Sequence, residues 1–302
     1  MTQPPFPAPG STDIALSVRT HERVGERRMD DAWLTAAWAD PATRVVPIAV
    51  TTFPVTDEGD AVRWTGADRL PEAGLRIFLG EHEDAAYFAL VVAEPTDEGR
   101  WTGLRGVVHL LGGPDAGLMV HATALAEWHA SHRFCPRCGG ELRSTAAGHV
   151  LVCQQCGRQQ FPRSDPAVIM MVTDGDRALL GRQAAWPEGR YSTLAGFVDP
   201  GESLEDAVVR EVAEETGVHV TDVTYFGNQP WPFPQSLMVG FFARATSTEI
   251  HVDKDEIDDA QWFSREEMKA QSEAGTLVLP GGISISRSLV EAWYGGPLPG
   301  SW

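Results

Sequence analysis

Residues Gly196–Val218 spell G-F-V-D-P-G-E-S-L-E-D-A-V-V-R-E-V-A-E-E-T-G-V, the stretch around which the rest of the chain is interpreted. Its apolar residues recur at helical spacing, which predicts an amphipathic helix over residues 203–216. Glu214 and Glu215 follow Glu211 by three and four residues, so the three carboxylates should project from one side of that helix. The sequence therefore predicts a loop–helix element that gathers negative charge.

Like charges at this spacing destabilise a helix, and only Arg210 lies nearby to offset them. A divalent cation such as Mg²⁺ prefers carboxylate and phosphate oxygens and would relieve the repulsion, whereas the alternative is an ordinary solvated acidic face. The spacing decides between the two. Gly196, Glu202, Arg210 and Gly217 complete the pattern G-x5-E-x7-R-E-U-x-E-E-x-G-U, in which U is aliphatic. The chain thus resembles the Nudix hydrolases, whose fold is an α/β/α sandwich.

The length of 302 residues suggests two domains, or one domain with a small insert. No run of about 18 apolar residues occurs, so no membrane span is expected. The proline-rich start lacks the layout of a signal peptide, and we expect a disordered tail at residues 1–12 and a cytoplasmic protein. The net charge of −18 argues against tight non-specific binding of nucleic acid, although it does not exclude a local basic patch.

All four cysteines fall into two C-x2-C pairs with fourteen residues between them, and a glycine follows each pair. This arrangement predicts a zinc ribbon over residues 131–160, with one structural Zn²⁺ held by Cys135, Cys138, Cys153 and Cys156. Two disulfides or a redox pair are the alternatives, and a reducing compartment disfavours disulfides. Nothing in the pattern suggests an open coordination position, so catalysis at the zinc is not expected.

Residues 13–130 carry no motif of known chemistry, and we expect an α+β domain there. Strand-like runs occur at residues 44–53, 75–79 and 85–92, and a helix is expected over residues 121–134. His121, His129 and His132 could bind a metal, but structural histidines are the better interpretation.

Residues 161–302 are expected to form the Nudix domain. Strands are predicted at residues 167–172, 178–181, 191–198, 221–227 and 237–245. Ser264 and Glu267 form a capping box that predicts the start of a helix, and a closing helix is expected over residues 283–293. Strands on both sides of the glutamate helix agree with the sandwich that the resemblance implies.

A proline-rich stretch follows ten residues after Val218 and should form a stiff loop, because proline fixes the backbone. Taken alone, it could be a rigid turn, a dimer contact or a ligand-recognition loop. Its position after the glutamate helix resembles the signature of the NADH pyrophosphatases within the Nudix family, which also carry a four-cysteine zinc ribbon. The resemblance covers residues 121–295 closely and assigns substrate contacts to Gln229, Pro230, Trp231, Pro232, Phe233, Pro234, Gln235 and Ser236.

The resemblance further implies catalytic and metal-binding roles. Glu211 and Glu215 should bind Mg²⁺ or Mn²⁺ together with Glu256 and the backbone carbonyl of Ala195. Glu214 or Glu215 is the candidate base, a choice that the sequence leaves open. Glu202 and Arg210 should hold the shape of the loop and helix.

Phe161 and Phe197 should stack on the nicotinamide ring. At a further substrate contact, Ser286 stands where the family often has alanine.

The implied reaction is hydrolysis of the diphosphate bond of NADH or NAD to nicotinamide mononucleotide and AMP. Removal of an NAD cap from RNA is the same cut on a longer substrate and stays open as an alternative. A catalytically weak nucleotide sensor is a third possibility, which the complete set of carboxylates disfavours. The apolar character of residues 229–242 predicts a homodimer, as does the family resemblance.

Overall fold

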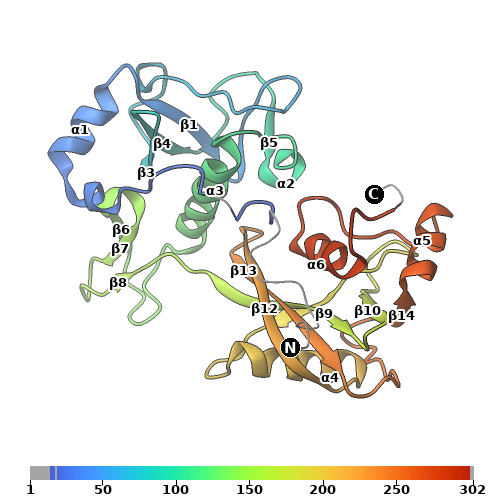
Figure 1. Cartoon of the computed structure of the whole chain (residues 1–302). Coiled ribbons are helices and arrows are strands. Elements are labelled where there is room, and N and C mark those ends of the chain that lie inside the picture. The colour runs from blue at the N-terminus through green and yellow to red at the C-terminus, as the bar shows by residue number, and fades with distance from the viewer. Residues whose placement is uncertain (1–13, 18, 300–302) are drawn as a thin grey trace, which may run out of the picture. The chain divides into compact units, whose positions relative to one another are not determined.

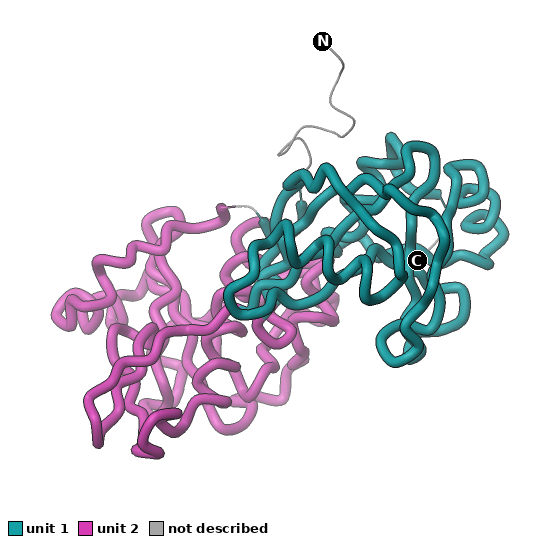
Figure 2. Tube along the Cα trace, turned by 90° about the horizontal axis from the view of Figure 1, so that it is seen from below, with its two compact units in different colours: residues 1–17, 165–231, 236–302 teal, residues 18–164, 232–235 magenta. Residues whose placement is uncertain are grey.

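The structure, a computed structural model, describes residues 14–17 and 19–299 (Figure 1). The expected tail at residues 1–12 lies outside the described residues. The chain divides into two compact units, which are coloured separately in Figure 2. One unit comprises residues 18–164 with 232–235, and the other comprises residues 1–17, 165–231 and 236–302.

The unit that contains residues 18–164 is built on a five-stranded sheet with the order β3-β4-β1-β2-β5. Its strands are β1 (Arg44–Ala49), β2 (Thr52–Pro54), β3 (Leu75–His82), β4 (Ala85–Val92) and β5 (Trp101–Gly103). The single strand predicted over residues 44–53 is two strands, because the chain reverses at Val50, whose φ is 58°. The strands predicted near β3 and β4 are confirmed.

Helices cover this sheet with aromatic side chains. The helices are α1 (Asp31–Ala39), α2 (Leu104–Val107) and α3 (Asp115–Ser131), with short 3₁₀-helices η1 (Gly25–Met29) and η2 (Ala67–Arg69). From α1, Trp33 packs edge-on against Phe78 and Trp38 packs edge-on against Phe88. Helix α3 begins six residues before the predicted start, and it buries Trp128 almost completely.

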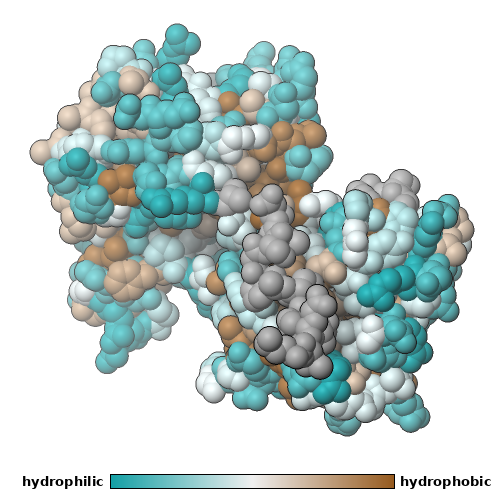
Figure 3. Space-filling model, in the orientation of Figure 1, coloured by the Kyte–Doolittle hydropathy of each residue, from teal (hydrophilic) through white to brown (hydrophobic). Residues whose placement is uncertain are grey.

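The zinc ribbon belongs to the same unit and forms a three-stranded sheet. Its elements are β6 (Leu142–Thr145), η3 (Ala146–Gly148), β7 (Val150–Cys153) and β8 (Gln159–Gln160). His149 Nε2 donates to the Phe78 carbonyl at 2.8 Å, and His129 Nε2 donates to the Gly148 carbonyl at 2.8 Å. These histidines therefore fasten the ribbon to β3 and α3. On the face shown in Figure 3, the surface over β6–β8 combines hydrophilic and hydrophobic residues.

The other unit is built on a six-stranded mixed sheet with the order β12-β13-β9-β10-β14, in which β11 also pairs with β9. Helix α4 (Leu204–Thr216) follows β11, α5 (Arg265–Glu273) follows β14, and α6 (Ile285–Tyr294) closes the unit. The strands are β9 (Asp165–Thr173), β10 (Arg177–Arg182), β11 (Leu194–Phe197), β12 (Val220–Trp231), β13 (Ser236–Ala245) and β14 (Asp259–Ser264).

Side chains of β9 point alternately to the two faces of the sheet, and each face is covered by a helix, which gives three layers. Val168, Met170 and Val172 pack with Val208 and Val212 of α4. The residues between them point to the opposite face, where Ile169 and Met171 pack with Ile285, Leu289 and Val290 of α6. The predicted α/β/α sandwich is therefore confirmed. Among the described residues, no helix combines the length and apolar character needed to cross a membrane.

Helix α4 begins and ends at the capping residues that the sequence predicts. Ser203 Oγ accepts a hydrogen bond from the Asp206 backbone at 3.1 Å, and Gly217 ends the helix with a φ of 69°. The predicted capping box of Ser264 and Glu267 is also present at α5. The predicted stiff loop is different, because β12 continues to Trp231 and leaves only residues 232–235 as a turn.

Candidate functional site

Arg210 connects the loop before α4 to the glutamates on α4. Its Nε and Nη2 donate to the two carboxylate oxygens of Glu202, both at 2.8 Å. Its Nη1 donates to Glu211 at 2.9 Å and to Glu214 at 2.8 Å. Its Nη2 also donates to the Phe197 carbonyl at 2.9 Å. The paired guanidinium lowers the pKa of Glu202 to about 2, so this carboxylate remains ionised and holds the loop to the helix.

Because Gly196 has no side chain, the Glu211 carboxylate can occupy the space beside it. A Cβ atom at position 196 would lie 1.9 Å from the Glu211 carboxyl carbon, which is closer than any real contact. The strand β11 can therefore pass beside α4 only with glycine at this position. Ala195 directly precedes it on β11.

Glu215 is a buried glutamate of α4 for which the described residues provide no ion pair. Its side chain is 7% exposed, and its Oε2 has no hydrogen-bond partner within the described residues. Burial, together with the charges of Glu211 and Glu256, raises the pKa of Glu215 to about 8. Burial likewise raises the pKa of Glu211, although Arg210 opposes that effect.

The charge of Glu256 thus acts on both helix glutamates. The segment before β14 approaches the end of α4 because the Asp253 backbone donates to the Glu215 carbonyl at 3.2 Å. A buried carboxylate oxygen without a partner, beside two further carboxylates, is the donor set that Mg²⁺ or Mn²⁺ prefers. The residues therefore fit a divalent cation. The backbone contact of Asp253 was not predicted.

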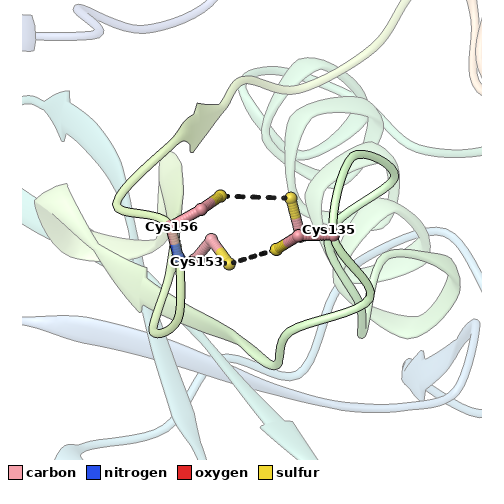
Figure 4. A group of neighbouring side chains, drawn as sticks. Cys135, Cys153 and Cys156 are labelled. Carbon is pink, nitrogen blue, oxygen red and sulfur yellow. Dashed lines mark hydrogen bonds between the residues drawn. The ribbon is translucent and has the colours of Figure 1, made fainter.

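The four cysteines converge as the spacing predicts, and Figure 4 labels three of them, Cys135, Cys153 and Cys156. Their sulfur atoms all lie within 4.8 Å of one another, with Cys135 and Cys156 at 3.8 Å and Cys138 and Cys153 at 3.5 Å. A tetrahedron with zinc–sulfur bonds of about 2.3 Å has edges of about 3.8 Å, whereas a disulfide requires about 2.0 Å. The arrangement therefore fits one Zn²⁺ and no disulfide. Among the described residues, no other cluster of His, Cys, Asp or Glu side chains is as compact.

Two predicted substrate contacts lie in the interior. The Gln229 side chain is fully buried and bonds to three backbone groups, namely Ala15 O at 2.6 Å, Ile283 O at 2.7 Å and Ile285 N at 2.9 Å. Ser286 is 1% exposed, and its Oγ meets Ser192 Oγ at 2.8 Å and Thr193 Oγ1 at 2.7 Å. The hydrogen bonds of both side chains therefore serve to fix the start of α6.

The aromatic candidates differ in exposure. Phe161 and Phe197 are 63% and 61% exposed, and they belong to different units of the chain. Phe233, in the turn after β12, lies with its ring 4.5 Å from the guanidinium of Arg105. Pro232 is buried, whereas Trp231 and the other residues of the turn are partly accessible or exposed. Phe161 and Phe197 thus offer the open ring faces that stacking requires.

Comparisons with known proteins identify three regions. Residues 163–278 match the NUDIX domain, residues 130–161 match the NADH pyrophosphatase zinc ribbon domain, and residues 46–128 match the NADH pyrophosphatase-like rudimentary NUDIX domain. The last match assigns a family to the region for which only a fold class could be predicted.

Curated relatives share these regions. The "NAD-capped RNA hydrolase NudC" of Mycobacterium bovis is 44% identical over 239 residues, which are 74% of this chain and 75% of that protein. The protein of the same name from Stutzerimonas stutzeri is 40% identical and covers 74% and 78% of the two chains. The "NAD-capped RNA hydrolase NUDT12" of Macaca fascicularis is 44% identical over 59% of this chain and 42% of its own length.

Replacement of Cys135 by Ser should release zinc and lower the melting temperature, because a structural zinc contributes directly to folding. Metal analysis and thermal unfolding of the purified variant measure both effects. Ser164→Ala, at an exposed position outside the cysteine pairs, should retain both zinc and stability. Wild-type protein that contains no zinc and melts at the same temperature with a chelator would contradict the assignment.

In metal-free protein, Glu215→Gln should increase stability at pH 8 but not near pH 4.5. The pKa of Glu215 in the folded protein is raised from its ordinary 4.5 to about 8. The part of the stability that depends on protonated Glu215 is therefore complete below pH 4.5 and is lost as the pH rises to 8. Glutamine does not ionise and avoids that loss. Thermal unfolding across this pH range measures the difference, with Glu205→Gln, an exposed position of α4, as the control. Added Mg²⁺ or Mn²⁺ should stabilise the wild type more than Glu215→Gln. If Glu215→Gln shows the same dependence of stability on pH as Glu205→Gln, the role of burial at Glu215 is contradicted.

Proposed function

The chain belongs to the Nudix hydrolases, in the group with an NADH pyrophosphatase zinc ribbon, and we propose that it hydrolyses the diphosphate bond of NADH or NAD. The products are nicotinamide mononucleotide, in its reduced form when NADH is cut, and AMP. The observation that carries this proposal is the unpartnered, buried Glu215 carboxylate beside Glu211 and Glu256. Such a site gains most from a cation that also binds diphosphate oxygens.

We assign the metal site to Glu211, Glu215, Glu256 and the carbonyl of Ala195. Mg²⁺ or Mn²⁺ held there would neutralise the diphosphate and activate water for attack. The water oxygen forms a bond to phosphorus, the bridging P–O bond breaks, and the water proton passes to a carboxylate oxygen.

For that proton we favour Glu215 over Glu214. Glu214 Oε2 already accepts a hydrogen bond from Arg210, whereas Glu215 Oε2 has no partner among the described residues. Glu202 and Arg210 act by positioning, since their paired contact holds the loop before α4.

The same cut on an NAD-capped RNA is the second candidate function. It is favoured by the names of the relatives, which are NAD-capped RNA hydrolases. The chemistry at the diphosphate is unchanged, and the two substrates differ only in the RNA chain attached to the adenosine. They are therefore distinguished by binding outside the carboxylate site.

Wild-type protein should turn over NADH, NAD and NAD-capped RNA, and Glu215→Gln should lower kcat by ~10²–10⁴ on each, the scale for loss of a metal ligand or base. One preparation, assayed with Mg²⁺ and with Mn²⁺ on all three substrates and on ADP-ribose, gives the order of preference. Glu205→Gln again serves as control. A Glu215→Gln variant with normal turnover, or a wild type inactive on all substrates, would refute the proposal.

Phe197→Ala and Phe161→Ala should each weaken binding of NADH by roughly 1–3 kcal/mol, the range for aromatic stacking on a base. The loss should be smaller for ADP-ribose, which lacks the nicotinamide ring. Michaelis constants for the two substrates measure the difference. Equal losses would mean that these exposed rings do not contact nicotinamide.

We also propose that the chain forms a homodimer along β12. This strand lies at the edge of its sheet, and its Tyr225 is 43% exposed, so it offers both backbone groups and an apolar ring to a second copy. Tyr225→Glu should then lower the mass measured by light scattering, because a charge without a partner is costly at an interface. A wild type that is monomeric and fully active at assay concentration would rule out the dimer.

A further inference from the structure

The ribbon segment differs in charge from the rest of the chain. The whole chain carries a net charge of −18, but residues 131–164 contain Glu141 as their single carboxylate and five arginines, which are Arg133, Arg137, Arg143, Arg158 and Arg163. Four thiolates around one Zn²⁺ contribute a net charge of about −2. The segment therefore remains positive within a strongly acidic protein.

Most of these arginines are not neutralised by neighbours. Arg133, Arg137, Arg143 and Arg158 are all exposed. Elsewhere in the chain, Arg63 pairs with Asp97 at 3.0 Å and Arg177 with Asp174 at 2.6 Å. In contrast, the four exposed arginines of the ribbon form no ion pair with any carboxylate that the structure describes. Their charge is available to an anion.

An exposed aromatic ring lies beside one of these arginines, Arg133. Phe134 is 63% exposed, which is unusual for phenylalanine. It borders a groove of about 470 Å³ that Arg133, His132 and Ser144 also line. His129 forms part of the wall, and its bond to the Gly148 carbonyl fixes its ring, while burial lowers its pKa and keeps it neutral. The groove therefore combines a fixed wall, an open aromatic face and the exposed guanidinium of Arg133, with Glu141 as the one carboxylate of its lining.

We propose that this ribbon surface binds single-stranded RNA, namely the RNA portion of an NAD-capped RNA. The inference rests on the second candidate function and adds a binding surface outside the carboxylate site. Phe134 stacks on a base and Arg133 contacts a phosphate in the groove, while Arg143, which does not line the groove, contacts a phosphate farther along the RNA. Proteins that bind single strands without strict sequence preference combine these two features, because every base has a face for stacking and every nucleotide a phosphate. Double-stranded RNA keeps its bases stacked and would leave Phe134 without a partner.

Binding of a single-stranded RNA of about 12 nucleotides to the zinc-loaded full chain tests this surface directly. The probe carries a 5′ monophosphate, so that binding is measured without cleavage, and fluorescence anisotropy gives the affinity. Phe134→Ala should weaken binding about five- to a hundredfold, whereas Phe134→Tyr should restore it. The double variant Arg133→Ala/Arg143→Ala should weaken binding and reduce the dependence of log K on log salt by roughly 0.7 for each lost phosphate contact.

Matched controls separate a local effect from a general one. Leu110→Ala removes an exposed apolar side chain outside the ribbon, and Arg69→Ala removes an exposed arginine outside it. Both should bind RNA as the wild type does. Zinc content and melting temperature must be unchanged in the ribbon variants. With capped RNA as substrate, these variants should raise KM and leave kcat near that of the wild type, while their turnover of NADH is unchanged.

The outcomes distinguish this inference from the proposed function. If the wild type cuts capped RNA and the ribbon variants bind and cut it equally well, the surface is wrong and the function stands. If the wild type cuts NADH but neither binds nor cuts RNA, the surface and the second candidate function both fail, while NADH hydrolysis stands. If Phe134→Ala instead dissociates a dimer in light scattering and leaves RNA affinity unchanged, the groove is an interface between copies, which overturns the proposal.

Discussion

The contact between Arg210 and the carboxylates around it is the interaction on which the candidate site depends. Without a cation at this position, Glu202, Glu211 and Glu214 would repel one another across the loop and the helix. Arg210 bonds to all three and to the carbonyl of Phe197. A guanidinium suits this task because its five donors point in fixed directions and can hold two carboxylate oxygens at once. Lysine could supply the charge but not this geometry.

The sheet beneath Arg210 determines where those carboxylates lie. Strand β9 is buried on both faces, so it can carry α4 on one side and α6 on the other. Strand β11 pairs with β9 and delivers Gly196 to the Glu211 carboxylate. The start of α6 is fixed in turn by the buried Gln229 and Ser286. Hydrogen bonds made at a distance from the carboxylates thus support the layers that carry them.

Local features of the sequence predicted much of this arrangement. The caps of α4, the cysteine pairs and the capping box of α5 each depend on residues within one short segment, so their spacing is sufficient. Features that depend on distant partners were missed or mistaken. The proline-rich stretch was expected to be a loop, yet Pro230 lies within β12, which is an edge strand where a missing backbone donor is tolerated. Neither the burial of Gln229 nor the turn at Val50 follows from local composition.

Glu215 shows how stability and function oppose each other within this fold. A buried carboxylate normally has hydrogen-bond partners, because desolvation of an unpaired charge is costly. The buried amide of Gln229 has hydrogen-bond partners for both its oxygen and its nitrogen. In contrast, one oxygen of Glu215 has no partner among the described residues. A cation that binds only the folded protein stabilises it by an amount that grows with its concentration. If the proposed metal site is correct, the carboxylate that weakens the metal-free protein also gives the metal its gain in binding, and the folding of α4 is coupled to metal binding through one side chain.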